Sequence, residues 1–298
     1  MLKSTLEQWR AFQAVVDYGG YAQAAEALHR SQSSISYLVS KLQEQMGLPL
    51  LVVEGRKAQL TEAGRTLLAH ANELLADALN LEQLAGSLAQ GWEPELRLVV
   101  DQAFPKVLLA QAMQRFQQIA AQTRVELIEV VLSGAEEAIV GQRADVMVGA
   151  YVPAGYLGSL LLDLDFVAVA HKAHPLHTLG RIIDEDDLKR HRHIVVRDSG
   201  TLNPRDEGWL GSAQRWTVSS LQASIELIAG GLGFAWLPLH MVRPWLDDDT
   251  LRPLPMVKGQ YRRASLYLVL GGGRSMQAGP AAQLLAQTLE ETVKASTL

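Results

Sequence analysis

Two short helices joined by a tight turn are predicted by the apolar positions near the start of the chain. In residues 21–28 the apolar side chains form one stripe at helical spacing. A second stripe follows the turn at positions i, i+3, i+4 and i+7, and consists of Ile35, Leu38, Val39 and Leu42. Ser31 precedes this second helix and can cap it through its side-chain oxygen. The second helix is therefore expected to bury one face and expose the other.

The exposed face of the second helix carries hydroxyl and amide groups with almost no net charge: Gln32, Ser33, Ser36, Tyr37, Ser40 and Lys41. In helix-turn-helix proteins, the N-terminal part of the second helix contacts base edges while the first helix crosses the DNA backbone. Glutamine can pair with adenine, and serine can pair with several base edges. The pattern therefore predicts a DNA-reading helix, although an ordinary helical hairpin with a solvated polar face has the same pattern.

A small hairpin is predicted directly after these helices. Residues 48–53 form a turn and a short apolar strand, and residues 58–61 return after a second turn. Arg56 and Lys57 lie at the tip of this wing, where they could contact DNA phosphates. Thr61 is the expected N-cap of the helix that follows.

A long helix with a coiled-coil seam is predicted for residues 62–90, which lack proline. Its apolar residues recur at alternating steps of four and three: Leu67, Ala71, Leu74, Ala78, Leu81, Ala85 and Leu88. A helix of this length extends about 40 Å, which is too long for the small preceding domain to cover. We predict that it pairs with the same helix of a second chain, so that a two-fold dimer meets a pseudo-palindromic site in double-stranded DNA. Packing on its own C-terminal domain is the alternative.

The remaining two-thirds of the chain has an α/β pattern. Strand-like runs are 96–100, 125–131, 145–149, 160–169, 194–197, 215–218, 233–237 and 265–270. Helical stretches alternate with them at 107–121, 135–142, 221–229 and 281–293. This alternation predicts parallel strands built from strand–helix–strand units.

Composition narrows the functional classes. The chain has 298 residues and no cysteine, which excludes disulfide frameworks and thiol chemistry. No apolar run is long enough to span a membrane, and Glu7 and Arg10 stand where a secretory signal would be apolar, so we expect a cytoplasmic protein with no membrane partner. Residues 1–65 contain seven basic and six acidic side chains. Since phosphate neutralisation supplies much of the affinity for DNA, one such domain should bind weakly and an oligomer should compensate.

Residues 1–65 resemble the N-terminal domain of LysR-type transcriptional regulators. The matching positions are Leu6, Phe12, Ala24-Ala25-x-x-Leu28, Ser31-Gln32-x-x-Ile35-Ser36, Leu42, Leu48, and Arg56 before Leu60-Thr61-x-Ala63-Gly64. The departures are Gly20 and Tyr21 in place of Ser and Phe, Ser33 in place of Pro, Tyr37 in place of Arg, and Leu51 and Val53 in place of Phe and Arg. We therefore expect unusual base preferences and phosphate contacts. The predicted DNA-binding residues are Arg30, Ser31, Gln32, Ser33, Ser34, Ser36, Tyr37, Ser40, Lys41, Arg56 and Lys57.

The resemblance continues more weakly to the C-terminus. It rests there on Arg143-Ala144-Asp145-Val146, His174-Pro175-Leu176 and Gly230-Gly231-Leu232-Gly233-x-x-x-Leu237-Pro238. It implies a two-lobed α/β domain like a periplasmic binding protein, with the chain crossing between lobes near 162–166 and 264–266. The predicted fold is thus multidomain: an all-α winged helix-turn-helix domain (1–65), a dimerisation linker helix (66–91), and an effector-binding domain (92–298) with lobe I at 92–163 and 267–298 and lobe II at 164–266.

The function implied is a DNA-binding transcription regulator switched by a small-molecule effector bound between the lobes. We expect a homodimer, and a homotetramer formed as a dimer of dimers. Such a switch requires that the effector bind two lobe arrangements unequally. The C-terminal domain could instead be a ligand-independent oligomerisation or partner-binding module. A more distant alternative is an enzyme or solute carrier that uses the N-terminal domain only for interactions.

Candidate effector contacts follow from the rule that ligands bind beyond the carboxyl ends of strands in open α/β sheets. The rule selects Asp101, Gln102, Phe104, Ser133, Gly134, Tyr151, Arg197, Ser199, Ser219, Ser220, Phe234 and Trp236, and it also reaches Gly149 and Asp198. Capping, turn formation or a place in the core is the alternative role for each of them.

Asp101 is the most informative of these residues. Many family members have Ser or Thr near this position and bind an effector carboxylate at a helix N-terminus. An aspartate would repel an anion and could itself take the anion position. We therefore expect a neutral, phenolic or cationic effector held by Asp101, with Phe104, Tyr151 or Trp236 as apolar walls. Arg197 could still hold an acid.

Catalytic, cofactor and metal sites are not predicted. The histidines in residues 171–177 are spaced three apart, but Pro175 breaks the helix that would group them as metal ligands. The glycines at 230–233 lie between a helix and a strand, in the wrong order for a dinucleotide loop, and those at 271–273 lack the Lys and hydroxyl of a phosphate loop. No G-x-S-x-G motif occurs. We therefore expect no enzyme activity, no cofactor and no metal.

Overall fold

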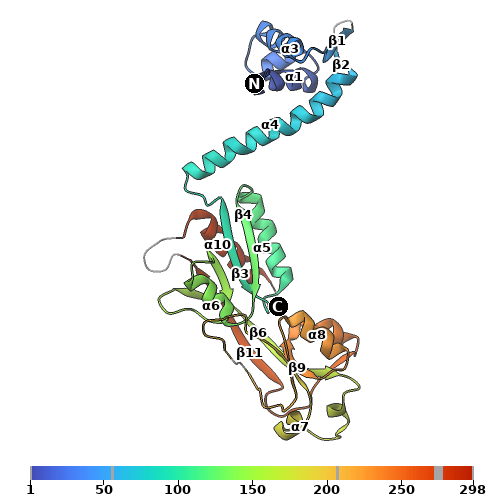
Figure 1. Ribbon diagram of the computed structural model, residues 1–298, viewed down its shortest axis with the longest axis vertical. Coiled ribbons are helices and arrows are strands. Elements are labelled where there is room, and N and C mark those ends of the chain that lie inside the picture. The colour runs from blue at the N-terminus through green and yellow to red at the C-terminus, as the bar shows by residue number, and fades with distance from the viewer. Residues whose placement is uncertain (1, 55–56, 206–207, 272–277, 297–298) are drawn as a thin grey trace. The chain divides into compact units, whose positions relative to one another are not determined.

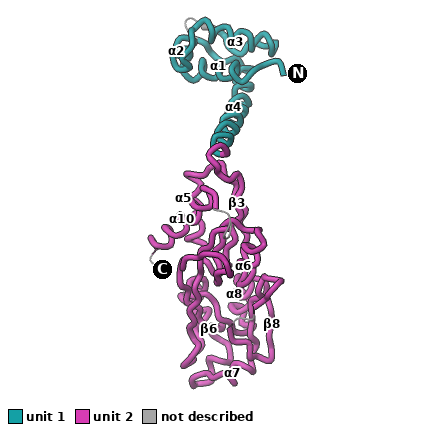
Figure 2. The backbone as a smooth tube through the Cα atoms, turned by 90° about the vertical axis from the view of Figure 1, so that its left-hand side faces the viewer, with its two compact units in different colours: residues 1–87 teal, residues 88–298 magenta. Residues whose placement is uncertain are grey.

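The computed structural model describes residues 2–54, 57–205, 208–271 and 278–296. The chain divides into two compact units, Met1–Ser87 and Leu88–Leu298 (Figure 2). Within the described residues, no helix combines the length and the apolar character that crossing a membrane requires.

Unit 1 contains a three-helix domain, a two-stranded wing and most of a long helix (Figure 1). Its elements are α1 (Leu6–Asp17), α2 (Tyr21–Ala27), α3 (Gln32–Met46), β1 (Leu51–Glu54), β2 (Lys57–Leu60) and α4 (Glu62–Ala89). The two strands pair antiparallel. The predicted winged helix-turn-helix fold followed by a long helix is therefore confirmed.

Side-chain hydroxyl groups cap the N-termini of two of these helices, as the sequence predicts. The Ser31 side chain accepts a hydrogen bond from Ser34 N (3.2 Å), and the Thr61 side chain accepts one from Gly64 N (2.8 Å). The Thr61 hydroxyl also donates to Pro49 O (2.7 Å). This one residue therefore caps α4 and ties its start to the segment before the wing. Loss of a side-chain N-cap typically costs about 1 kcal/mol.

The core of unit 1 includes residues of α4 that lie on and beside the predicted seam. Phe12 and Ile35 are fully buried at the centre of this core. Leu68, Ala71 and Leu75 of α4 pack into the same cluster. The first turns of α4 thus belong to the helix-turn-helix domain, while the seam leucines farther along the helix are exposed.

Unit 2 is built on one mixed β-sheet with helices packed against it (Figure 1). Its strands are β3 (Glu95–Asp101), β4 (Arg124–Val130), β5 (Val146–Gly149), β6 (Gly158–His171), β7 (His193–Val196), β8 (Arg215–Val218), β9 (Phe234–Pro238), β10 (Leu251–Pro253) and β11 (Tyr261–Leu270). Its helices are α5 (Lys106–Ile119), α6 (Ser133–Val140), the 3-10 helix η1 (Pro175–Thr178), α7 (Glu185–Lys189), α8 (Leu221–Ala229), α9 (Leu239–Asp247) and α10 (Pro280–Ala295).

Two parallel arrays are joined in this sheet by a long antiparallel pair. β3 runs parallel to β4 and β5, and β7 runs parallel to β8 and β9. β11 pairs antiparallel with β5 and β6, and β6 pairs antiparallel with β9. The prediction of parallel strands therefore holds within each lobe and is wrong for β6 and β11. These two strands carry the chain between the lobes instead of closing a strand–helix–strand unit.

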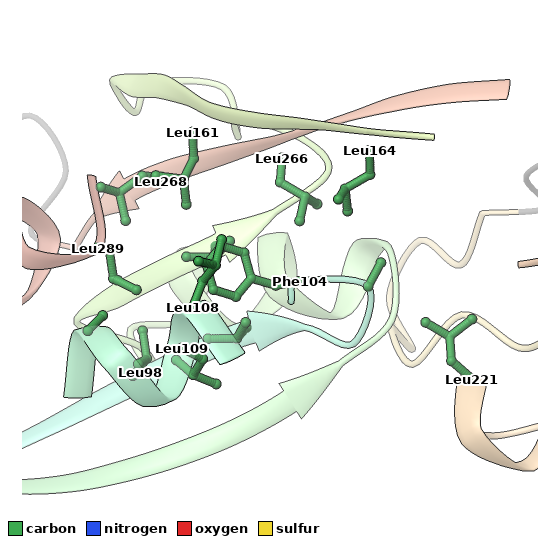
Figure 3. Packing of buried hydrophobic residues seen from close by; sticks show 14 of the residues in the cluster. Leu98, Phe104, Leu108, Leu109, Leu161, Leu164, Leu221, Leu266, Leu268 and Leu289 are labelled. Atoms are coloured by element: carbon green, nitrogen blue, oxygen red, sulfur yellow. The ribbon is translucent and has the colours of Figure 1, made fainter. Parts of the chain in front are cut away.

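The largest hydrophobic core of unit 2 packs α5 and α10 against the sheet. Leu98, Phe104, Leu108, Leu268 and Leu289 belong to it (Figure 3). Phe104 is 1% exposed and lies among the leucines. This packing holds the carboxyl end of β3, and with it Asp101, in a fixed position.

We expect Gly64→Ala to destabilise unit 1, because the added methyl group would overlap the Leu50 carbonyl oxygen. Overpacking of this kind costs about 1–3 kcal/mol. Gly86→Ala is the matched control in α4: nothing lies within 4 Å of its methyl group, and the change should raise stability by up to about 1 kcal/mol. Urea unfolding of the full chain, followed by circular dichroism, measures both. Equal effects of the two substitutions would contradict the assignment of Gly64 to a close backbone contact.

Candidate DNA-binding surface and ligand cavity

The polar face of α3 is exposed to solvent, and the opposite face of the helix is buried. Ile35, Val39 and Leu42 are each 0% exposed, which fixes the rotation of the helix about its axis. Tyr37 is 67% exposed. The other exposed side chains on this face are Gln32, Ser33, Ser36 and Ser40. The structure thus places five of the eleven predicted DNA-binding residues on one exposed surface.

Two of the predicted cations on this domain have acidic neighbours. Arg30 Nη2 lies 2.9 Å from Glu7 Oε1, and Lys41 Nζ lies 2.8 Å from Glu44 Oε2. Exposed ion pairs contribute little free energy. Either cation can therefore exchange its carboxylate for a phosphate at small cost.

Arg30 and Ser31 lie in the turn directly before α3. His29 adopts the left-handed conformation with φ 52°, and Arg30 N donates to Ala25 O (2.9 Å). Positive φ is uncommon outside glycine, although histidine tolerates it better than most residues. Of the predicted wing contacts, Lys57 is the first residue of β2, and Arg56 lies outside the described residues.

A cavity of about 380 Å³ lies between the two lobes of unit 2. Lobe I contributes residues at and beyond the carboxyl ends of β3, β4 and β5. Lobe II contributes β7, β9 and the start of α8, and the joining strands β6 and β11 complete the lining. This position beyond the strand ends is where the sequence places a ligand. Three predicted effector contacts line the cavity, namely Asp101, Tyr151 and Trp236.

The remaining predicted contacts lie outside the cavity wall. Phe104 and Phe234 are 1% and 0% exposed and belong to the hydrophobic cores. Arg197 and Ser219 are exposed. Ser220 caps α8 by accepting a hydrogen bond from Ala223 N (3.1 Å). Gln102 instead bridges the lobes, since its Oε1 accepts from Leu221 N (2.9 Å). Ser133, Gly134 and Ser199 also lie where the lobes meet.

Asp101 is a buried carboxylate at the cavity wall. It accepts hydrogen bonds from Ala103 N (2.8 Å) and Leu132 N (3.0 Å). Burial raises the pKa of its carboxyl group to about 6, and the two backbone N–H groups oppose this effect. Asp198 lies near enough to raise the pKa of Asp101 slightly further.

Residues 198–205 of lobe II form an interlobe clasp over the start of α6. Asp198 accepts hydrogen bonds from Ser133 N (3.1 Å) and from the Ser133 hydroxyl (2.7 Å). The Ser199 hydroxyl accepts a hydrogen bond from Val131 N (2.9 Å). A methyl group added at Gly134 would collide with the Ser199 hydroxyl, so glycine leaves room for the hydrogen bond that this hydroxyl makes.

The rest of the clasp consists of charged contacts. Glu137 accepts hydrogen bonds from Thr201 N (2.6 Å) and Leu202 N (3.1 Å), and these bonds lower its pKa to about 2. Arg205 Nη2 lies 2.7 Å from Glu136 Oε2, and the Arg205 guanidinium lies 3.7 Å from the centre of the Tyr151 ring. The clasp therefore joins the lobes beside the cavity through both neutral and charged hydrogen bonds.

Sequence reasoning missed several residues of the cavity wall, including Phe166, His193, Trp209 and Arg262. The strand predicted at 194–197 begins one residue after His193, so the prediction did not include His193 as a strand residue. The structure places Trp209 in a loop, where no periodic pattern marks it.

Among the described residues, no group of three or more His, Asp and Glu side chains is arranged to hold a metal ion. His174 Nδ1 instead accepts a hydrogen bond from Leu176 N (3.2 Å). The three-residue spacing of these histidines is thus a feature of a short turn.

Comparison with known families divides the chain as the fold does. Residues 6–65 match the model of the bacterial regulatory helix-turn-helix protein, lysR family. Residues 89–294 match the model of the LysR substrate binding domain.

Individual proteins show the same likeness. The uncharacterized HTH-type transcriptional regulator YeeY of Escherichia coli K12 is 33% identical over 255 residues, covering 84% of this chain and 82% of its own. The probable HTH-type transcriptional regulator YhaJ of the same strain is 30% identical, with 83% and 85% covered.

Solved structures support the fold. The full-length Vibrio cholerae virulence activator AphB, a member of the LTTR protein family, gives a TM-score of 0.51 at 16% identity over 96% of this chain and 99% of its own. Full-length LysG from Corynebacterium glutamicum with bound effector Arg gives 0.51 at 18% identity, with 97% and 98% covered. With both units matched in this way, the chain belongs to the LysR family of transcriptional regulators and combines a helix-turn-helix DNA-binding domain with an effector-binding domain.

Proposed function

We propose that this regulator works in the cytoplasm as a homo-oligomer on a pseudo-palindromic site in double-stranded DNA, and that a small molecule in the interlobe cavity controls it. The observation that carries the proposal is the geometry of α3. Ile35, Val39 and Leu42 on its apolar face are fully buried, and most of its hydroxyl and amide side chains face solvent. A helix held in this way can enter a major groove without rearrangement of its domain.

Hydrogen bonding, more than charge, is the proposed basis of sequence reading. Gln32, Ser33, Ser36 and Tyr37 offer donors and acceptors at the N-terminal part of α3, which is the part that meets base edges in this motif. Residues 1–65 carry a net charge of only +1, from seven basic and six acidic side chains. The phosphate contribution per domain is therefore small, and simultaneous binding by several domains must supply the remaining affinity.

Self-association through α4 supplies those additional domains in this proposal. Leu74, Leu81 and Leu88 are 49%, 68% and 49% exposed and follow one another at intervals of seven residues. Ala78 and Ala85 lie between them in the same seam. An exposed apolar row at this spacing is suited to a paired helix. A second contact between dimers would produce the homotetramer.

Effector control is proposed to act through the junction of the lobes. The cavity touches both lobes, and the interlobe clasp lies beside it. A ligand that binds better to one lobe arrangement shifts the population toward that arrangement. In an oligomer, such a shift would change the spacing between paired DNA-binding domains.

We expect Gln32→Ala and Tyr37→Ala each to weaken binding to the chain's own promoter region by about 10- to 100-fold, because one good base contact contributes about 1–3 kcal/mol. Electrophoretic mobility shift measures this, and size-exclusion chromatography should show an unchanged oligomer. Gln287→Ala on α10 is the control for loss of an exposed glutamine. Promoter binding that survives both α3 substitutions would contradict the proposed reading helix.

Leu81→Glu should abolish one step of self-association, because it places a charge in the exposed seam of α4. Leu79→Glu is the matched control, since Leu79 is 57% exposed on the same helix but lies off the seam. Sedimentation equilibrium of the full chain distinguishes the two variants. If Leu81→Glu assembles as the wild type does, α4 is not the dimerisation element.

A further inference from the structure

The lobe II wall of the cavity is aromatic. His193, Trp209 and Trp236 line it, and Phe234 lies behind them. The His193 ring stacks on Phe234 with centroids 4.9 Å apart and 7° between planes. The centroids of Trp209 and Trp236 lie 5.7 and 5.4 Å from that of His193. These rings pack in mutually fixed orientations, so they present a preformed surface to a flat ligand.

One nitrogen of this wall has no partner within the described part of the protein. His193 is only 5% exposed, and its Nδ1 atom makes no hydrogen bond there. Burial lowers the pKa of His193 to about 4, so the ring is neutral near pH 7. A neutral imidazole nitrogen can donate or accept, depending on the tautomer. Because this atom has almost no exposed surface, a polar group of a ligand reaches it only when the neighbouring side chains shift, and the bond then satisfies a buried atom that has no partner among the described residues.

On the lobe I side, carboxylates of the protein already accept the hydrogen bonds that backbone N–H groups could otherwise donate to a ligand. Asp101 holds the N–H groups of Ala103 and Leu132, and Asp198 holds the N–H group of Ser133. An acidic ligand would have to displace one of these carboxylates or approach Asp101 directly. Two carboxylates close to each other repel strongly in a low-dielectric site. This side of the cavity therefore disfavours a carboxylate and favours a hydrogen-bond donor.

Cations of the protein already lie over two rings of the lining. The Arg205 guanidinium lies 3.7 Å from the centre of the Tyr151 ring, and that of Arg262 lies 4.9 Å from the centre of a Trp236 ring. A cationic ligand seeking these aromatic faces would meet like charge. These cations therefore disfavour a cationic ligand, whereas the disfavour toward an anionic ligand comes from the carboxylates on the lobe I side.

We propose that the effector is an uncharged aromatic or heteroaromatic molecule with a hydrogen-bond donor, such as a phenol or an N–H heterocycle. Its ring packs against Trp209 and Trp236, its donor points to Asp101, and a second polar group reaches His193. A cavity of about 380 Å³ has room for such a small ring system. This inference rests on the proposed ligand control and makes its chemistry specific.

The test uses five probes on the full-length protein. Catechol and indole represent the two donor types, benzoate and indole-3-carboxylate are their acidic counterparts, and cyclohexanol lacks the aromatic ring. Isothermal titration calorimetry and melting temperature report binding, because a ligand that binds only the folded state raises its stability. We expect catechol or indole to bind at least about tenfold more tightly than the acids and cyclohexanol, a factor worth about 1.4 kcal/mol.

Three variants assign the binding to this cavity. Trp209→Leu and Asp101→Asn should each weaken the preferred probe at least about tenfold, corresponding to about 1.4 kcal/mol. Trp216→Leu is the matched control, because Trp216 is 43% exposed on β8 and outside the cavity lining. Trp209→Leu decides the outcome alone if Asp101→Asn fails to fold.

Several results would overturn the inference. They are absence of saturable binding by both catechol and indole, equal or tighter binding of the acids or of cyclohexanol, and an equal loss in Trp216→Leu and Trp209→Leu. Mobility shift by the unliganded wild type is measured in parallel. Promoter binding that persists when the probes fail confines the failure to the ligand class, whereas its absence counts against the proposed function itself.

Discussion

The antiparallel pairing of β6 with β11 is the constraint on which the ligand domain depends. Both strands pass between the lobes, and their register places Leu162 beside Leu266 and Phe166 beside Arg262. Because β11 also pairs with β5, and β6 with β9, the hydrogen bonds of one sheet connect the parallel arrays of both lobes. The cavity lies against this pair, so a change in lobe closure must bend or twist strands that also form its wall.

The junction of the lobes is satisfied largely by the protein's own groups. Asp198 and Glu137 each accept hydrogen bonds from the opposite lobe, and Gln102 of lobe I accepts one from Leu221 N of lobe II. Buried polar groups without partners are costly, so these contacts stabilise the arrangement of the lobes that the structure shows. Asp101 retains a raised pKa because burial outweighs its two backbone hydrogen bonds.

The DNA-binding unit combines a rigid helix with little charge. Val39 and Leu42 hold α3 in place, and the near balance of acidic and basic side chains over residues 1–65 limits what one domain can gain from phosphates. α4 bears both on the fixed position of α3 and on the need for more than one DNA-binding domain. Its first turns, including Leu68 and Leu75, complete the core of the domain, and its later turns expose an apolar row suited to a second copy of the chain.

Local features of the sequence determined the winged helix-turn-helix fold, the caps at Ser31 and Thr61, and most α/β elements, because helical periodicity and capping act over a few residues. The tertiary structure alone decided which side chains meet at the cavity. Phe104 follows the same strand as Asp101 but turns into the core, while Trp209 reaches the cavity from a loop without a periodic pattern. The cavity wall is assembled from strands distant in the sequence. The pairing of these strands depends on the packing of the whole unit rather than on local pattern.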